Sequence, residues 1–301
     1  MPKKGRRRRR KQGLSARARK HRVPLAVGGI LLIAAAGVLT EQIVTANSSA
    51  ISTANSLINS PCQNMVVPAY FYPGEWTRAD DSKPVPRIMI LDVAGAGAGR
   101  APQRKYQVAV NRAQAAGITV MGYSDTDYTQ RSPAAVEADV RNYKAWYGVT
   151  DIFLDQVSSG RAQLGYYRNL ASYIHSVNPG SAVMLNPGTY PDQQYMSVGD
   201  IVMVFENTYA SYVSLQVPGW VRRYPATRFA YVIYGTSGSQ LANAISLAQQ
   251  RRAGFVYVTN GTGLDRYDSL PGYFSRENTI IAGCTPNANA APRSSSGAAG
   301  S

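Results

Sequence analysis

Eight short apolar runs recur along residues 65–261, and stretches with helical periodicity separate most of them. This alternation is typical of a parallel sheet whose strands are joined by crossover helices. Eight repeats of the strand–helix unit favour a single-domain α/β fold, a (β/α)8 TIM barrel, over a doubly wound sheet. The predicted strands are residues 65–73, 86–93, 118–125, 151–156, 182–188, 200–207, 228–235 and 255–261.

Four of the connecting segments carry helix signals. The first, residues 103–116, ends at Gly117, and glycine is common at the left-handed position that follows a helix. Ser132 and Pro133 suit the N-cap and first position of a second helix, which runs through residue 146. The other two predicted helices cover residues 162–177 and 239–253. We expect loops or short helices after the first, fifth and sixth strands.

The positive charge of the chain is concentrated at its start. The formal net charge is +15, from 32 basic and 17 acidic residues, yet residues 1–22 hold twelve of the Lys and Arg residues and no acid. Removing these twelve leaves 20 basic and 17 acidic residues, so the remaining chain carries only +3. Residues 1–22 therefore form a basic cytoplasmic tail, and a nucleic-acid partner is not predicted for the nearly neutral main domain.

An uncharged apolar run, residues 23–39, follows the basic tail. A basic segment before an apolar one is the pattern of export signals. We expect residues 23–44 to be a signal-anchor in the membrane with the N-terminus inside, or a signal peptide cleaved after "VTA" at residues 44–46. The third alternative is a buried helix. The first two place the main domain outside the cytoplasm, membrane-anchored or secreted.

Two cysteines flank the predicted barrel domain, residues 61–284. Cys62 precedes the first strand, and Cys284 follows the last recognisable element. In an oxidising compartment one pair of cysteines is most simply a disulfide, here joining the two ends of a closed barrel. The alternative is two unpaired buried thiols. Residues 45–60 are expected to be a flexible stalk and residues 285–301 a disordered tail, because both are poor in apolar residues that could join a core.

Polar side chains collect where the predicted strands end, which is where the active site of a TIM barrel lies. Asp155 and Glu206 each follow a strongly apolar strand, and burying a charge there without a function is costly. Glycoside hydrolases use two carboxylates across a cleft, with aromatic rings that stack on the sugars. Asp155 and Glu206 are therefore the predicted catalytic residues. The predicted substrate-binding residues are Tyr70, Tyr72, Asp92, Tyr123, Asp125, Gln156, Asn186, Tyr209, Tyr257 and Asn260.

Other kinds of chemistry lack their residues. The two histidines and two cysteines lie away from the strand ends, so neither a zinc site nor a Ser-His-Asp arrangement is predicted. The glycine-rich residues 95–99 lack the spacing of a phosphate loop. No metal or organic cofactor is expected. Asp92 has a structural alternative, holding the glycine loop, and so does Asp125, capping the segment that follows it.

Several ordered motifs resemble the spherulin-4, or spherulation-specific family 4, proteins, which include glycoside hydrolase family 135. The matching segments are "VPAYFYPGEW" (67–76), "GYSDTDYTQR" (122–131), "VRNYKAWYGVTDIFLDQ" (140–156), "NPG" (186–188), "VFENTY" (204–209), "YVTNG" (257–261) and "YDSLPGYF" (267–274). The resemblance implies an exported (β/α)8 barrel that acts endo on galactosamine or N-acetylgalactosamine polymers of microbial exopolysaccharide. Asp155 would be the nucleophile or cation stabiliser and Glu206 the general acid/base, or the reverse.

The chain departs from the family pattern at three positions. Gln156 stands where the fourth strand of the family usually ends in a second carboxylate, Asp92 where Asn is frequent, and Asn260 where Asp is frequent. The leading hypothesis is therefore a glycoside hydrolase that uses Asp155 and Glu206. The alternative is a carbohydrate-binding cell-surface protein that has lost catalysis on the same barrel.

Overall fold

The computed structural model describes Leu57, residues 62–264 and residues 266–283. The predicted tail 1–22, the apolar segment 23–44 and the tail 285–301 lie outside these residues, as does all of the stalk except Leu57. Within the part of the chain that is described, no helix is both long and apolar enough to cross a bilayer. The predictions for those outer segments stay predictions.

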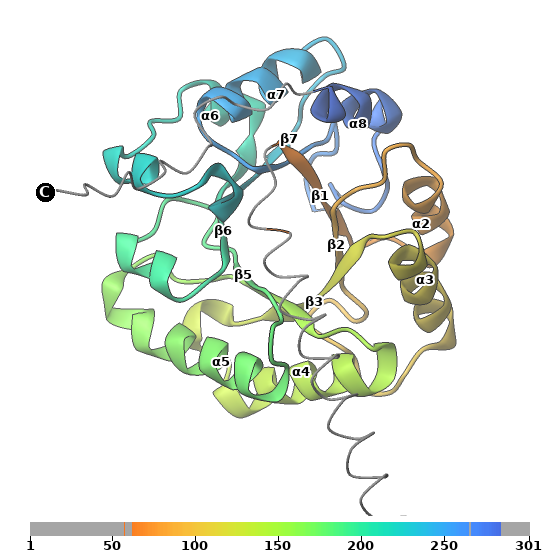
Figure 1. Cartoon of the computed structure of the whole chain (residues 1–301), viewed down its shortest axis with the longest axis vertical. Helices are drawn as coiled ribbons and strands as arrows, with labels where there is room; N and C mark the ends of the chain where they lie inside the picture. The colour runs from red at the N-terminus through yellow and green to blue at the C-terminus, as the bar shows by residue number, and fades with distance from the viewer. Residues whose placement is uncertain (1–56, 58–61, 265, 284–301) are drawn as a thin grey trace, which may run out of the picture. The chain divides into compact units, whose positions relative to one another are not determined.

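Eight parallel strands close into a barrel, because each pairs with its neighbours in chain order and β8 also pairs with β1. Figure 1 shows helices lying around the outside of the strands. The predicted (β/α)8 TIM-barrel fold is confirmed. The strands are β1 (Asn64–Ala69), β2 (Ile88–Leu91), β3 (Thr119–Asp125), β4 (Asp151–Asp155), β5 (Val183–Leu185), β6 (Ile201–Thr208), β7 (Phe229–Tyr234) and β8 (Phe255–Val258).

The α-helices of the described chain are α2 (Pro73–Asp80), α3 (Arg104–Ala115), α4 (Pro133–Tyr147), α5 (Leu164–Val177), α6 (Tyr209–Val213), α7 (Leu241–Gln250) and α8 (Phe274–Ala282). Short 3-10 turns cover Asp127–Thr129, Arg161–Gln163, Gln193–Ser197, Gly219–Arg223 and Ala226–Arg228. The four predicted helices correspond to α3, α4, α5 and α7. As expected, the links after β1, β5 and β6 consist of loops and short helical segments. They contain the eight-residue α2, a 3-10 turn, and the five-residue α6 followed by two 3-10 turns, respectively.

The outer helices hold the strand ends in place through close packing. On β3, a side chain at Gly122 would begin 2.6 Å from the Tyr143 ring of α4, so only glycine lets this helix approach so closely. The Tyr143 hydroxyl then donates to the Leu91 carbonyl, at 3.0 Å, at the end of β2. One residue of α4 thus fixes two neighbouring strands just before their polar ends.

An irregularity in β6 sets the direction of its last residues. Met203 pairs with Ala230 of β7, but Phe205 pairs with Tyr231, so one extra residue lies between the two pairs. Because successive strand residues face opposite sides, an extra residue reverses the alternation from that point on. Phe205 accordingly packs outward on the Tyr212 ring of α6, and Glu206 turns into the barrel.

Candidate active site

The two predicted catalytic carboxyls meet at the carboxyl ends of the strands. Asp155 ends β4, Asn186 follows β5, and Glu206 lies near the end of β6. The side-chain nitrogen of Asn186 donates to Asp155 Oδ1 at 2.7 Å and to Glu206 Oε2 at 2.6 Å. A single amide therefore bridges the two carboxyls, and both keep partial exposure to solvent.

The second oxygen of each carboxyl accepts from a tyrosine. Tyr123 of β3 donates its hydroxyl to Asp155 Oδ2 at 2.8 Å, and Tyr267 donates to Glu206 Oε1 at the same distance. The Tyr70 ring packs edge-on against both, with ring centroids 5.4 Å from Tyr123 and 5.7 Å from Tyr267. All four carboxyl oxygens thus have a donor, and three packed tyrosine rings adjoin the pair.

The orientation of the Asn186 amide is fixed by the turn that follows. Its carbonyl oxygen accepts from the backbone N–H of Gly188 at 2.9 Å, which leaves the NH2 group facing the carboxyls. Gly188 has φ +63°, a left-handed conformation that glycine adopts without strain. The "NPG" motif is therefore the local reason that the amide points its donors at Asp155 and Glu206.

The electrostatics of the pair favour one bound proton. Burial, and then the nearby charge of Glu206, raise the pKa of the Asp155 carboxyl to about 7, against the lowering effect of its donors Tyr123 and Asn186. Two carboxylates so close cannot both be ionised at low cost. Burial and the adjacent carboxylates also raise the pKa of the Tyr123 and Tyr267 hydroxyls, which therefore remain protonated donors.

The carboxyl separation can be bounded from the bridge. Because the Asn186 nitrogen lies 2.7 Å from Asp155 Oδ1 and 2.6 Å from Glu206 Oε2, these two oxygens are at most about 5.3 Å apart. Retaining glycosidases hold their carboxyls about 5–5.5 Å apart, and inverting enzymes about 6.5–9.5 Å apart. The limit applies to the two facing oxygens, and it is shorter than the separation that is typical of inverting pairs.

Asp92 and Asp125 are held by their own loops. Asp92 Oδ1 accepts from the backbone N–H groups of Ala94 and Gly95, at 3.1 and 2.8 Å, so it anchors the glycine-rich loop as the structural alternative anticipated. Asp125 Oδ1 accepts from the Asp127 N–H at 2.7 Å. Each carboxylate satisfies nearby backbone, and neither bonds to the Asp155–Glu206 pair.

Gln156 follows Asp155 in a left-handed conformation, with φ 50°. Its carbonyl accepts from the Tyr128 N–H at 2.9 Å and from the Thr126 hydroxyl at 2.9 Å. Its backbone N–H helps to lower the pKa of Asp155. The residue therefore ties the loop after β3 to the catalytic strand through its backbone.

Four other predicted substrate-binding residues have surroundings of their own. Tyr72 is 75% exposed and has the Lys105 ammonium 4.7 Å from its ring centroid. Tyr209 starts α6, where its hydroxyl accepts from the Asn243 side chain at 2.8 Å. Asn260 is exposed in the loop after β8. Tyr257 is 0% exposed, so it is a core residue and is not placed to touch a sugar.

Two further predictions concern cysteines and metals. Cys62 is partly buried just before β1, whereas Cys284 lies outside the described residues, so the disulfide stays a prediction. Within the described ranges no group of three or more His, Cys, Asp or Glu side chains is arranged to hold a metal ion.

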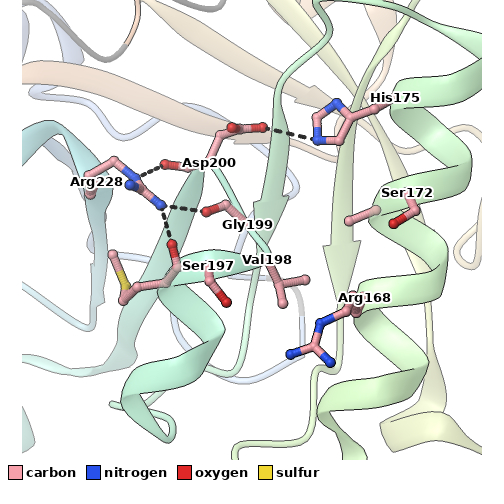
Figure 2. Close-up of a pocket in the computed structure, with 10 residues that line it drawn as sticks. Arg168, Ser172, His175, Ser197, Val198, Gly199, Asp200 and Arg228 are labelled. Atoms are coloured by element: carbon pink, nitrogen blue, oxygen red, sulfur yellow. Dashed lines mark hydrogen bonds and ion pairs between the residues drawn. The ribbon is translucent and has the colours of Figure 1, made fainter.

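A separate pocket of about 220 Å³ lies between α5 and the segment that leads into β6 (Figure 2). Asp200 directly precedes β6 and Arg228 directly precedes β7, so this pocket lies at the end of the strands opposite to the carboxyl pair. Arg228 donates to the carbonyls of Met196 and Gly199, both at 2.7 Å, and His175 lies 3.8 Å from the Asp200 carboxylate. Arg228 mainly holds backbone carbonyls together here, and neither Asp155 nor Glu206 lines this pocket.

Comparison with known proteins identifies the family to which the chain is related. Residues 64–281 match the model of the spherulation-specific family 4, named Spherulin4. The chain belongs to this family. Spherulin-4 from Physarum polycephalum is 30% identical over 264 residues, which cover 83% of this chain and 76% of the relative.

Solved structures share the fold of this spherulin-4 family member. Sph3 from Aspergillus clavatus, solved in complex with GalNAc, is 24% identical, with 75% of this chain and 99% of Sph3 covered and a TM-score of 0.65. A chitinase from Chromobacterium violaceum is 10% identical, with 74% and 100% covered and a TM-score of 0.50. The chain is thus a TIM barrel of the spherulin-4 family whose fold also occurs in a glycoside hydrolase.

Tyr267 is the site residue that strand-end reasoning missed. It lies nine residues beyond the end of β8, in a segment without strand or helix periodicity. Only the family motif "YDSLPGYF", which begins with this tyrosine, marks it in the sequence. Arg131 and Asp139 were also missed as supports of the site. Their ion pair of 2.6 Å joins the loop after β3 to α4, and Arg131 also donates to the Ala96 carbonyl in the loop after β2.

Proposed function

We propose that this protein is a glycoside hydrolase that cleaves an amino-sugar-containing microbial polysaccharide with the Asp155–Glu206 pair. The observation that supports this proposal most directly is the carboxyl pair itself. Asn186 bridges the two carboxyls at the strand ends, and their facing oxygens are at most about 5.3 Å apart. Membership of the spherulin-4 family and the GalNAc complex of the similarly folded Sph3 support a galactosamine or N-acetylgalactosamine polymer.

The geometry supports a double displacement. One carboxyl donates its proton to the glycosidic oxygen as that C–O bond breaks, and the ionised carboxyl forms an ester to the anomeric carbon. The first carboxylate then takes a proton from water, whose oxygen displaces the ester. The raised pKa of Asp155 favours Asp155 as the proton donor and Glu206 as the nucleophile, the second of the two assignments open from the sequence. The first product should retain its anomeric configuration, which ¹H NMR of the early reaction measures.

The direct test incubates the full-length protein in detergent with galactosamine and N-acetylgalactosamine polymers and looks for released oligosaccharides by mass spectrometry. Asp155→Asn and Glu206→Gln should each abolish release. Asp151→Asn is the matched control, because Asp151 lies at the opposite end of the same strand. Release by either catalytic variant at the wild-type rate would refute the assignment.

The roles within the pair can be separated by azide. The variant that lacks the acid/base should regain turnover with azide and yield a glycosyl azide of retained configuration. The variant that lacks the nucleophile should yield the inverted azide or none.

A second candidate function is carbohydrate binding without cleavage. Gln156 favours it, because an amide stands where the family usually has a second carboxylate beside Asp155. The same polymer panel separates the two, since retention of the protein on an immobilised polymer without any product would support binding alone.

We also propose that the barrel is exported, with residues 1–22 on the cytoplasmic side. The support is the basic segment followed by the uncharged run 23–39. Protease added to intact cells should cut the barrel domain and spare an epitope placed at the N-terminus. Protection of the barrel would contradict export.

A further inference from the structure

We propose that Asn186 is a positioning residue that keeps the two catalytic carboxyls from sharing a proton directly, and that it does not bind the sugar. This inference rests on the proposed function for its catalytic meaning. Its physical content concerns only the carboxyl pair and can be tested without a substrate.

Every hydrogen-bonding group of the Asn186 side chain has a partner. A side-chain amide has two N–H donors and one carbonyl acceptor. Asp155 and Glu206 take the two donors, and the Gly188 N–H occupies the carbonyl. The side chain is also only 5% exposed. No donor is left for a sugar hydroxyl, so the earlier expectation of a substrate contact is replaced by a contact to the catalytic groups.

Without the Asn186 bridge, the two carboxyls could share a proton directly. Two buried carboxyls at such short range commonly share one proton through a direct O–H···O contact, because both cannot ionise. The Asn186 nitrogen lies between the facing oxygens and donates to each. A hydrogen bond to the charged form of an acid favours that form. The amide therefore lets each carboxyl gain or lose its proton while its partner is held in place.

The bridge between the two carboxyls requires an amide at residue 186. Among uncharged side chains, a primary amide is the group that carries two hydrogens on one atom and can direct them at two separate acceptors. An aspartate of the same shape would present oxygen atoms to both carboxyls and could donate at most one hydrogen. A serine could also donate only one. The substitution Asn186→Asp therefore removes the bridge with little change in side-chain volume, and Asn186→Ser removes it with a shorter, uncharged side chain.

The test is a carboxyl titration of the full-length protein in detergent, using ¹³C NMR of aspartate labelled at the side-chain carboxyl. The Asp155 resonance is assigned from its absence in Asp155→Asn. Losing one charge-assisted donor should move the Asp155 midpoint upward by about one to two pH units in Asn186→Asp and by a smaller amount in Asn186→Ser.

Asn178→Asp is the matched control. Asn178 is also buried, at 3% exposed, and donates to the Thr150 carbonyl at 3.3 Å, at the far end of β4 from Asp155. Its replacement likewise buries an acid, but should leave the Asp155 midpoint within a few tenths of a pH unit. An unchanged midpoint in a folded Asn186 variant, or an equal shift in the Asn178 control, would overturn the proposal.

A measurement on the wild type covers the case in which the Asn186 variants fail to fold. Both side-chain N–H resonances of Asn186 should move with the Asp155 titration in ¹H–¹⁵N spectra, because each hydrogen faces a carboxyl. Two unmoved resonances would refute the bridge. If the titrations behave as expected and no polymer is cleaved, the proposed function fails and the role of Asn186 in the pair stands.

With an active enzyme, a pH profile adds a catalytic readout. The profile of kcat/KM for Asn186→Ser should shift to higher pH along with the Asp155 midpoint. A merely structural role would lower kcat/KM at every pH and leave the profile in place.

Discussion

Replacing Tyr267 with phenylalanine removes a single hydrogen bond to the Asp155–Glu206 pair. The ring would stay, 7% exposed and 5.7 Å from the Tyr70 ring, whereas the hydroxyl that donates to Glu206 Oε1 at 2.8 Å would be lost. A hydrogen bond to a charged group contributes about 1.5–3 kcal/mol. At about 1.4 kcal/mol for each factor of ten, Tyr267→Phe should lower kcat/KM roughly 10- to 150-fold.

The assay is initial-rate kinetics on the polymer that the wild type cleaves, with urea unfolding to confirm the fold. Tyr273→Phe is the matched control, because the Tyr273 hydroxyl donates to the Thr236 carbonyl at 2.9 Å and touches no carboxyl of the pair. It should cost about 1 kcal/mol of stability and leave kcat/KM unchanged. A folded Tyr267→Phe protein within twofold of wild type would show that Glu206 does not depend on this donor.

Three other changes probe the supports of the site. Asp139→Ala leaves the partly buried guanidinium of Arg131 without its 2.6 Å partner, and should cost about 3 kcal/mol in urea unfolding; a loss below about 1 kcal/mol would contradict this. Gly188→Ala places an L-residue at φ +63° and should lower the free energy of unfolding by about 1–2 kcal/mol in the same assay. Turnover should fall as well, because the N–H that orients Asn186 shifts. Burial raises the pKa of Glu277 well above its usual range, so the native state keeps a proton that the unfolded chain releases. Stability should therefore fall by about 1.4 kcal/mol per pH unit above about pH 4.3, until the native pKa is reached. Glu277→Gln should lack this part of the pH dependence when unfolding is compared at pH 5 and pH 7, and identical slopes for the two proteins would refute it.

The strand order and the proximity of Asp155 and Glu206 could be predicted because both depend on simple local patterns. Asp155 and Glu206 each end an apolar run, and parallel strands bring such ends to one edge of a barrel. The count of eight such runs was enough to predict that the sheet closes into a barrel. The strand ends were overestimated by up to four residues, because segments such as 70–73 continue the apolar and aromatic composition of β1 beyond its last residue, Ala69.

The remainder of the site depends on contacts that a linear pattern does not contain. Tyr257 and Tyr123 look alike in sequence, yet one is sealed in the core and the other donates to Asp155. Asp92 bonds to its own loop because backbone N–H groups two and three residues away are nearer than any partner across the barrel. Tyr267 reaches Glu206 from an irregular segment 61 residues further along the chain.

The extra residue in β6 has a consequence for how such a site changes over evolutionary time. If the extra residue paired with Tyr231, every later residue of β6 would move one position along β7, so Phe205 would enter the cleft and Glu206 would face the helix layer. Deleting the extra residue would instead leave Phe205 paired with Tyr231 and Glu206 paired with Val232, so the Glu206 carboxyl would keep its direction. A one-residue slip of register could thus silence the pair without altering either carboxylate, whereas a one-codon deletion at the irregularity would leave it in place. Relatives that keep both acids should therefore be compared by strand register as well as by residue identity.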